Sequence, residues 1–305
     1  MKIAMPTISV IITTYNRAHL LPRAIESAQA AGSNLEVLVV DDASTDGTRE
    51  LCARMTAIRY LCLSSNRGLA QARNVGIAES SSEFITFLDD DDLRLPGSLD
   101  AQLRVLEAHG EAAFCYGQAL IGDAQRQLPT GQIYPASCPK GDIFWDLLEQ
   151  NFIPMPSVLV RKSSLLEQGC FNTELRLAED WDMWLRLCEG SLVAALKAPV
   201  AIHRKAIGES EQMCSNSAEL CRQALAVQQM ALNRFRARSA TRSRRRQVRQ
   251  RLLDCAYEIL MTEATNAIHE GDVKSAGVKL REAFSFRPFR TMVSGRLPWL
   301  LIALR

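Results

Sequence analysis

The first ninety residues alternate short apolar runs with segments of helical character. The apolar runs are rich in β-branched residues and predict strands at residues 7–16, 35–42, 58–65 and 83–90. The segments between them predict helices at residues 20–30, 44–55 and 68–80. Strands that alternate with helices form βαβ units, so we expect an α/β fold, with a Rossmann-like, mostly parallel sheet and flanking helices.

Polar side chains follow three of these four predicted strands. They are Tyr15 and Asn16 after the first strand, Asp41 and Asp42 after the second, and Asp89–Asp92 after the fourth. In open α/β sheets, ligands bind at the carboxyl ends of the strands. We therefore expect these three polar strand ends to converge on one crevice.

Four consecutive aspartates, Asp89–Asp92, crowd like charges directly behind an apolar strand. Aspartates two positions apart at a strand end face the same side, so Asp89 and Asp91 can both reach one cation. Hard divalent cations such as Mg²⁺ and Mn²⁺ take carboxylate oxygens together with substrate phosphates. A divalent cation is therefore the first interpretation, and a capping cluster for the following helix is the second.

The remaining chain has two parts of different character. Residues 98–200 mix predicted strands at 112–121, 156–162 and 192–196 with predicted helices at 98–110 and 181–190. The last ninety residues are helical in pattern, with segments at 218–238, 244–272 and 273–288. We therefore expect a helical C-terminal region after a mixed α/β part.

Cysteine usage and hydropathy indicate a cytoplasmic protein. The nine cysteines are an odd number without metal-ligand spacing, which is typical of reduced thiols. Polar residues return too early after Met1 for a signal peptide, and no window reaches the ~18 apolar residues that span a bilayer. We expect a cytoplasmic location, with peripheral attachment to the inner face of the plasma membrane as an open alternative.

Five motifs occur in order, and together they carry a family resemblance. They read SVIITTYNR, VLVVDDASTDGT, GLAQARNVGI, FLDDDDLRLP and LAEDWDMWLRL. In this order they resemble glycosyltransferase family 2, whose members have the GT-A fold and transfer sugars with inversion. The resemblance runs from Thr7 to Gly208, about two thirds of the chain. It implies a catalytic domain at 1–215, with a nucleotide-sugar half at 1–97 and an acceptor half at 98–215, followed by a helical region at 216–305.

The resemblance also implies which residues bind the nucleotide. Thr13 and Tyr15 match positions that bracket the base and ribose, and Asp42 matches the aspartate at the edge of the base. Arg73 matches a basic residue near the nucleotide, and a guanidinium suits a diphosphate because it can donate two parallel hydrogen bonds. The donor implied by the family is a nucleotide-diphospho-sugar, with a UDP-sugar expected.

The aspartate run matches the family's DxD motif, which holds a divalent cation on the diphosphate. Asp89 and Asp91 match the two metal-binding positions, and the implied cofactor is Mn²⁺ or Mg²⁺. Because four aspartates blur the register, Asp90 and Asp92 have no unique assignment. We expect Asp90 on the nucleotide side of the site.

The motif at 177–187 matches the family's catalytic-base region. Asp180 matches the general base, which takes the proton of the acceptor hydroxyl as that oxygen attacks the anomeric carbon. We expect Glu179, Trp181 and Trp184 beside it, shaping the acceptor pocket. Asp182 is an alternative base, but two residues further along a helix it points elsewhere. The motif also fits an amphipathic helix whose aromatic side lies in the core.

The chain departs from the family pattern after the catalytic domain. Many relatives carry a Tyr-Arg-x-His segment there, whose histidine approaches the metal or diphosphate. Here His203 and Arg204 are present, but Ala206 stands at the histidine position. Arg204 or Lys205 is the candidate substitute, and we expect His203 to be structural.

Ten arginines and no acidic residue lie between Leu220 and Leu253. Anionic lipid headgroups attract such segments, and the tail at 286–305 mixes arginines with aromatic residues in a way that suits a membrane interface. A solvated face and contacts with the catalytic domain are the alternatives. No nucleic-acid motif accompanies the arginines, so we expect no nucleic-acid partner.

These observations predict an inverting, metal-dependent glycosyltransferase. Its donor would be a nucleotide-sugar, and its acceptor a surface glycan or a lipid-linked glycan of the cell envelope. One alternative is an inactive sugar- or nucleotide-binding scaffold. Another is a nucleotidyltransferase, although the residues after the first strand do not form the glycine-rich phosphate loop that this class uses.

Overall fold

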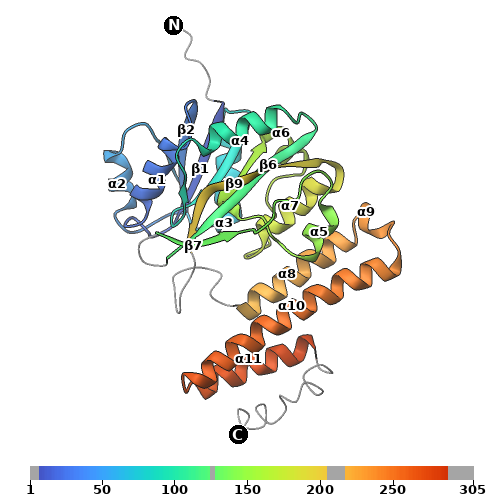
Figure 1. The fold of residues 1–305 in the computed structure, drawn as a ribbon. Coiled ribbons are helices and arrows are strands. Elements are labelled where there is room, and N and C mark those ends of the chain that lie inside the picture. The colour runs from blue at the N-terminus through green and yellow to red at the C-terminus, as the bar shows by residue number, and fades with distance from the viewer. Residues whose placement is uncertain (1–6, 124–127, 205–216, 288–305) are drawn as a thin grey trace. The chain divides into compact units, whose positions relative to one another are not determined.

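The computed structural model describes residues 7–123, 128–204 and 217–287 (Figure 1). The chain forms two compact units, one of Met1–Leu147 with Asn151–Gly208 and one of Leu148–Gln150 with Glu209–Arg305. The expected boundary between residues 215 and 216 falls within the segment 205–216, which lies outside the described residues. The same holds for Lys205, for Ala206 and for the tail from residue 288.

One mixed sheet forms the centre of the first unit, with the strand order β3-β2-β1-β4-β8-β6-β9-β5 and with β7 paired to β6. The strands are β1 (Ile8–Thr14), β2 (Leu35–Asp41), β3 (Arg59–Cys62), β4 (Phe84–Asp89), β5 (Leu93–Arg94), β6 (Ala112–Gly122), β7 (Pro129–Tyr134), β8 (Val158–Arg161) and β9 (Leu192–Arg204). The four strands predicted in the first ninety residues are all present. They pair in parallel, with β1 between β2 and β4 and with β3 beside β2.

The second half of the sheet is mostly antiparallel. Strand β8 runs antiparallel to β4 and β6, β7 runs antiparallel to β6, and β5 runs antiparallel to β9. Only β9 is parallel to β6 in this half of the described sheet. The two-residue strand β5 directly follows the aspartate run and returns the chain beside the end of β9, so that it brings Asp92 close to His203.

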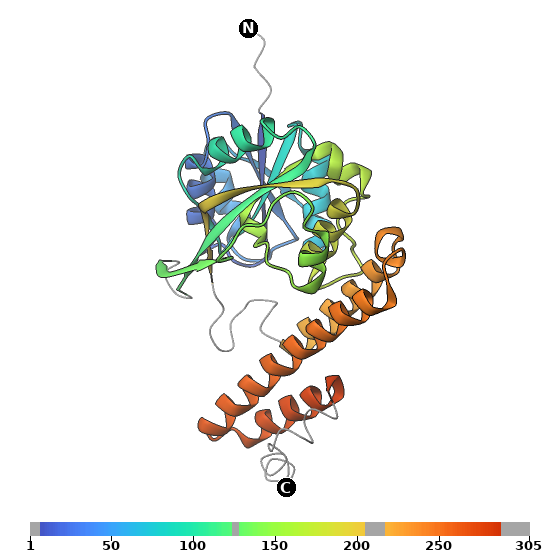
Figure 2. The same ribbon diagram turned by 45° about the vertical axis from the view of Figure 1, so that its right-hand side comes forward.

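Helices cover both faces of the sheet (Figures 1 and 2). Before residue 192 they are α1 (Leu21–Ala30), α2 (Thr48–Arg54), α3 (Leu69–Glu79), α4 (Ser98–Glu107), α5 (Phe144–Glu149), the 3-10 helix η1 (Met155–Ser157), α6 (Lys162–Glu167) and α7 (Glu179–Gly190). Val10 and Ile12 of β1 belong to a core with α1 and α4. The alternate residue Ile11 faces α3, where Gly76 leaves no room for a side chain: a Cβ there would lie 2.5 Å from Ile11. Alternation along β1 thus packs one helical layer on each face.

The second unit is helical, as predicted. It contains α8 (Ser217–Leu232), α9 (Phe235–Arg238), α10 (Arg242–His269) and α11 (Val273–Phe286). Helices α10 and α11 form a hairpin around the buried residues Tyr257, Leu260, Met261, Ala264, Leu280 and Ala283. The segment 218–238, predicted as one helical segment, is interrupted after Leu232 because the backbone of Arg234 is extended. Among the described residues, no helix is both long enough and apolar enough to cross a bilayer.

Candidate functional site

The candidate site lies at the carboxyl ends of β1, β2 and β4. The register of these parallel strands places Thr13 beside Asp89 and Thr14 beside Asp41. The Thr13 hydroxyl donates to Asp89 at 3.3 Å, and the Thr14 hydroxyl donates to Asp90 at 2.8 Å. The polar strand ends that the sequence pattern singles out therefore meet at one edge of the sheet.

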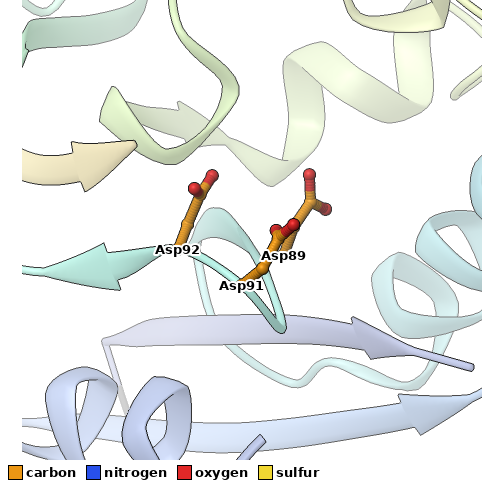
Figure 3. A group of neighbouring side chains, drawn as sticks. All are labelled: Asp89, Asp91 and Asp92. Atoms are coloured by element: carbon orange, nitrogen blue, oxygen red, sulfur yellow. The ribbon is translucent and has the colours of Figure 1, made fainter. Parts of the chain in front are cut away.

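Three of the four consecutive aspartates face a common point. Asp89 ends β4, and the chain then turns, with the backbone N–H of Asp92 bonded to the carbonyl oxygen of Asp89. Figure 3 shows the carboxylates of Asp89, Asp91 and Asp92 on the same side of this turn. One oxygen from each lies within 4.8 Å of the others. Asp90 instead bonds to Thr14 and Arg17.

This group of three aspartates suits a hard divalent cation. Oxygens on opposite sides of a six-coordinate Mg²⁺ lie about 4.2 Å apart, so small movements would bring all three carboxylates onto one ion. Asp89 and Asp91 are the two residues expected to bind metal, and the geometry adds Asp92 to them. The tight turn explains this addition, because it ends the strict alternation of side chains that holds within a strand.

Basic groups of the chain itself offset the charge of the aspartate run. Arg204 donates to Asp91 at 2.8 Å and Arg17 approaches the same oxygen at 3.4 Å. His203 contacts Asp92 at 3.0 Å, and the backbone N–H of Arg204 donates to Asp92 at 2.8 Å. Opposite charges this close favour the ionised carboxylates, which would otherwise repel each other.

Burial and these contacts act in opposite directions on the pKa values of the aspartates, and the net pKa values of Asp90, Asp92 and His203 are all raised. Burial raises the pKa of Asp90 to about 7, against the lowering effect of Arg17. Burial likewise raises the pKa of Asp92 to about 6, and the charge of Asp92 raises the pKa of His203 to about 9. Protonation of these carboxylates would therefore compete with the binding of a metal cation to them.

Arg73 connects the aspartate run to the start of α7. Its side chain is 2 % exposed, and its guanidinium donates to Asp89 at 2.8 Å and to Glu179 at 2.5 Å. The ring of Phe171 lies against it, with 5.6 Å between the guanidinium carbon and the ring centre. We expected Arg73 near the nucleotide, and in the structure its guanidinium lies buried between the carboxylates of Asp89 and Glu179.

Asp180 is half-buried in the first turn of α7. It accepts hydrogen bonds from the side chain of Asn151 at 3.3 Å and from the backbone N–H of Trp181 at 2.6 Å. Burial raises its pKa, while the charge of Arg73 opposes that shift. A raised pKa makes a carboxylate a stronger proton acceptor, as a general base requires.

The two tryptophans of α7 lie in the core. Trp181 is 2 % exposed, and its indole N–H donates to the carbonyl oxygen of Leu147 at 2.8 Å. Trp184 is fully buried beside Phe114 and Phe171. The alternative of an amphipathic helix with a buried aromatic side therefore describes α7 better than a tryptophan-lined pocket. The carboxylate of Asp182 pairs with Arg186 along the helix, away from Asp180.

The expected nucleotide residues occupy the ends of β1 and β2. Both carboxylate oxygens of Asp42 accept backbone N–H groups, from Arg67 and Gly68, at 2.8 Å each. This contact fixes the start of α3 against β2. Tyr15 is 45 % exposed, which leaves its ring available for stacking, whereas Thr13 is buried beside Asp89.

The site also contains Arg17, which had no assigned role in the sequence pattern, and Asp92, which had no unique one. Arg204 was a candidate substitute for the family histidine and His203 was expected to be structural, and both contact the aspartates. Arg17 follows the last residue of β1 by three positions, and in open α/β sheets ligands bind at the carboxyl ends of the strands. His203 and Arg204 lie more than a hundred residues from the aspartates and meet them only because β9 pairs with β5.

Comparison with known proteins gives the family. Residues 9–167, just over half of the chain, match the family model for glycosyl transferase family 2. An uncharacterized glycosyltransferase of Haemophilus influenzae is 31 % identical over 186 residues, which cover 60 % of this chain and 62 % of the relative. The GalNAc(5)-diNAcBac-PP-undecaprenol beta-1,3-glucosyltransferase of Campylobacter jejuni is 32 % identical over 194 residues, which cover 60 % of each chain. The chain thus matches less than two thirds of these relatives' own length, and it belongs to glycosyl transferase family 2.

Solved structures share the fold. S. aureus TarS 1-349 in complex with UDP-GlcNAc has a TM-score of 0.61 at 19 % identity, and the match covers 98 % of this chain and 79 % of TarS 1-349. The mannosyltransferase PcManGT from Pyrobaculum calidifontis, in complex with GDP-Man and Mn²⁺, has a TM-score of 0.58 at 17 % identity, with 99 % of this chain and 87 % of that chain covered. These likenesses confirm the GT-A-like architecture predicted from the sequence.

Replacing Arg73 by methionine tests whether the buried arginine holds the site together. Arg73→Met would leave Asp89 and Glu179 without their shared cation, so we expect the free energy of unfolding to fall by about 3–5 kcal/mol. Urea denaturation measures this change. Arg59→Met is the matched control, because Arg59 also bridges two glutamates but is 45 % exposed, and about 0–1 kcal/mol is expected there. Equal losses in the two variants would contradict the account.

Proposed function

We propose that the chain is an inverting, metal-dependent glycosyltransferase that moves a sugar from a nucleotide-diphospho-sugar to a hydroxyl group. The observation that carries the proposal is the position of Arg73, which bonds both to Asp89 of the aspartate group and to Glu179 beside Asp180. Metal-binding carboxylates and a candidate base therefore belong to one continuous site. A transfer reaction needs these two functions within the length of a sugar.

In this proposal, Asp89, Asp91 and Asp92 hold Mn²⁺ or Mg²⁺. When bound, the cation supplies Lewis-acid stabilisation of the departing diphosphate. Arg17 and Arg204 share the oxygen of Asp91 and lie where a diphosphate would approach, so their guanidinium groups can donate to its oxygens. Asp90 positions Arg17, with which it forms an ion pair of 3.1 Å.

Asp180 serves as the general base. It accepts the proton of the acceptor hydroxyl while that oxygen attacks the anomeric carbon from the side opposite the diphosphate. Asn151 donates to one carboxylate oxygen and holds the group in place. Arg73 and Glu179 hold the first turn of α7 against the end of β4, so Asp180 keeps a fixed position relative to the donor.

The donor is proposed to be a UDP-sugar, with the exposed ring of Tyr15 stacking on the base and with Thr13 and Asp42 at the strand ends beside it. The support is the TarS structure, which shares the fold and was determined with UDP-GlcNAc.

The acceptor is proposed to be a surface glycan or a lipid-linked glycan. Here the support is the Campylobacter jejuni relative, whose name specifies an undecaprenol-linked glycan.

Calorimetric binding of UDP, GDP, TDP and CMP, with and without Mn²⁺, tests the donor site. We expect one nucleoside diphosphate to bind in a Mn²⁺-dependent manner, and Asp91→Asn to weaken that binding about tenfold or more because a cation ligand loses its charge. The control is Glu83→Gln, which removes a charge from a residue whose side chain is 70 % exposed. Binding that is equally tight without metal, or in Asp91→Asn, would overturn the metal-dependent reading.

Asp180→Asn tests the base. We expect the rate of sugar transfer to fall by about 10²–10⁴, since the amide cannot accept the proton, while the nucleotide binds as before. Release of nucleoside diphosphate from the best-binding donor, with a glycan-lipid extract as acceptor, measures the rate. Asp182→Asn, on the same turn of α7, should retain transfer as long as its melting temperature shows an intact fold. Full activity in Asp180→Asn would exclude this residue as the base.

A further inference from the structure

A strongly basic surface occupies one part of the second unit. Arg242, Arg246 and Arg249 are spaced by four and three residues along α10, so they lie on one face of the helix, and all three are exposed. Arg238, at the end of α9, is exposed as well. Arg249 donates to the neutral side chain of Gln229.

The arginines of the other face of α10 have a different environment. Arg251 forms an ion pair with Glu149, and Arg244 lies 3.9 Å from the same glutamate. The segment from Leu220 to Leu253 has no acidic residue of its own, so the exposed arginines have no counter-charge within that segment. Like charges gathered on one exposed face raise the positive potential of the solvent beside it.

An aromatic side chain stands in the same region. Phe235 begins α9 and is 86 % exposed, the largest exposed fraction among the large hydrophobic side chains of the described residues. Its neighbours in sequence are Arg234 and Arg236. A phenylalanine gains free energy by leaving water, so insertion of this exposed ring into an apolar phase would be favourable.

We propose that Phe235, Arg238, Arg242 and Arg246 form a docking surface for anionic phospholipid membranes. The arginines bind the headgroup phosphates, and Phe235 inserts at the boundary between the headgroups and the acyl chains. Interfacial membrane binding combines electrostatic attraction of basic residues to anionic headgroups with burial of apolar side chains, and this surface offers both. A strand of nucleic acid would instead need several aromatic platforms along a basic groove, and this surface offers one.

This inference does not depend on the transferase proposal, because none of its residues belongs to the candidate site. It does bear on that proposal, since a protein bound to an anionic leaflet would encounter a lipid-linked acceptor by diffusion within the plane of the membrane. The test therefore measures membrane binding and not activity.

Co-sedimentation of the full chain with vesicles tests the proposal. One set of vesicles contains phosphatidylcholine alone, and the other contains phosphatidylcholine with an equal amount of phosphatidylglycerol. We expect binding to the anionic vesicles only, weakening as salt is added. The triple variant Arg238→Gln, Arg242→Gln, Arg246→Gln should bind roughly 100-fold more weakly, at about fivefold per arginine. Phe235→Ala should bind about tenfold more weakly.

A matched control removes the same charge elsewhere. Arg54, Arg104 and Lys140 are exposed residues of the first unit, and their joint replacement by glutamine should leave vesicle binding unchanged. Melting temperatures of all variants should equal that of the parent chain because every replaced side chain is exposed. Three results would overturn the proposal: equal binding to neutral vesicles, undiminished binding by the triple variant, or an equal loss in the control. Absence of vesicle binding together with tight binding to a poly(U) probe would assign the surface to nucleic acid instead.

Discussion

The buried ion pairs of Arg73 are the interaction on which the rest of the site depends. A guanidinium that is 2 % exposed is stable only if its charge is paired, and Asp89 and Glu179 supply the opposite charge and accept from its two terminal nitrogens. This requirement ties helix α3, the end of strand β4 and the first turn of α7 to one another. As a result, the carboxylates proposed to bind a cation and the carboxylate proposed to accept a proton are held in fixed positions relative to one another.

The same electrostatic logic explains how the chain tolerates four consecutive aspartates. Each carboxylate has a basic partner: Arg73 for Asp89, Arg17 for Asp90, Arg17 and Arg204 for Asp91, and His203 for Asp92. These partners come from three distant parts of the chain, namely the segment after β1, helix α3 and the end of β9, so the charges are neutralised only in the folded chain. A divalent cation that binds the aspartates must compete with the arginines, and the displaced guanidinium groups would then be available to a diphosphate.

The sequence predicted the parallel half of the sheet well, because β-branched runs and helical periodicity are local signals that β1 to β4 and α1 to α3 carry clearly. It also located the polar strand ends, since parallel strands must place their carboxyl ends at one edge. It could not locate the two-residue strand β5, which is too short for any periodicity. The pairing of β5 with β9 brings His203 to Asp92 and Arg204 to Asp91, so the sequence could name Arg204 as a candidate but could not predict which aspartate it contacts. The core position of Trp184 was left open as well, because helical spacing shows that one face of a helix is apolar but does not show what covers that face.

A crystal structure of the chain with UDP and Mn²⁺ tests the central claim most directly. The account predicts Mn²⁺ about 2.0–2.3 Å from carboxylate oxygens of the group Asp89, Asp91 and Asp92, with the diphosphate on its open side. It also predicts that Arg204 leaves Asp91 for the diphosphate, while Arg73 keeps both of its carboxylate partners. A nucleotide bound without metal, with Arg204 still on Asp91, would contradict it.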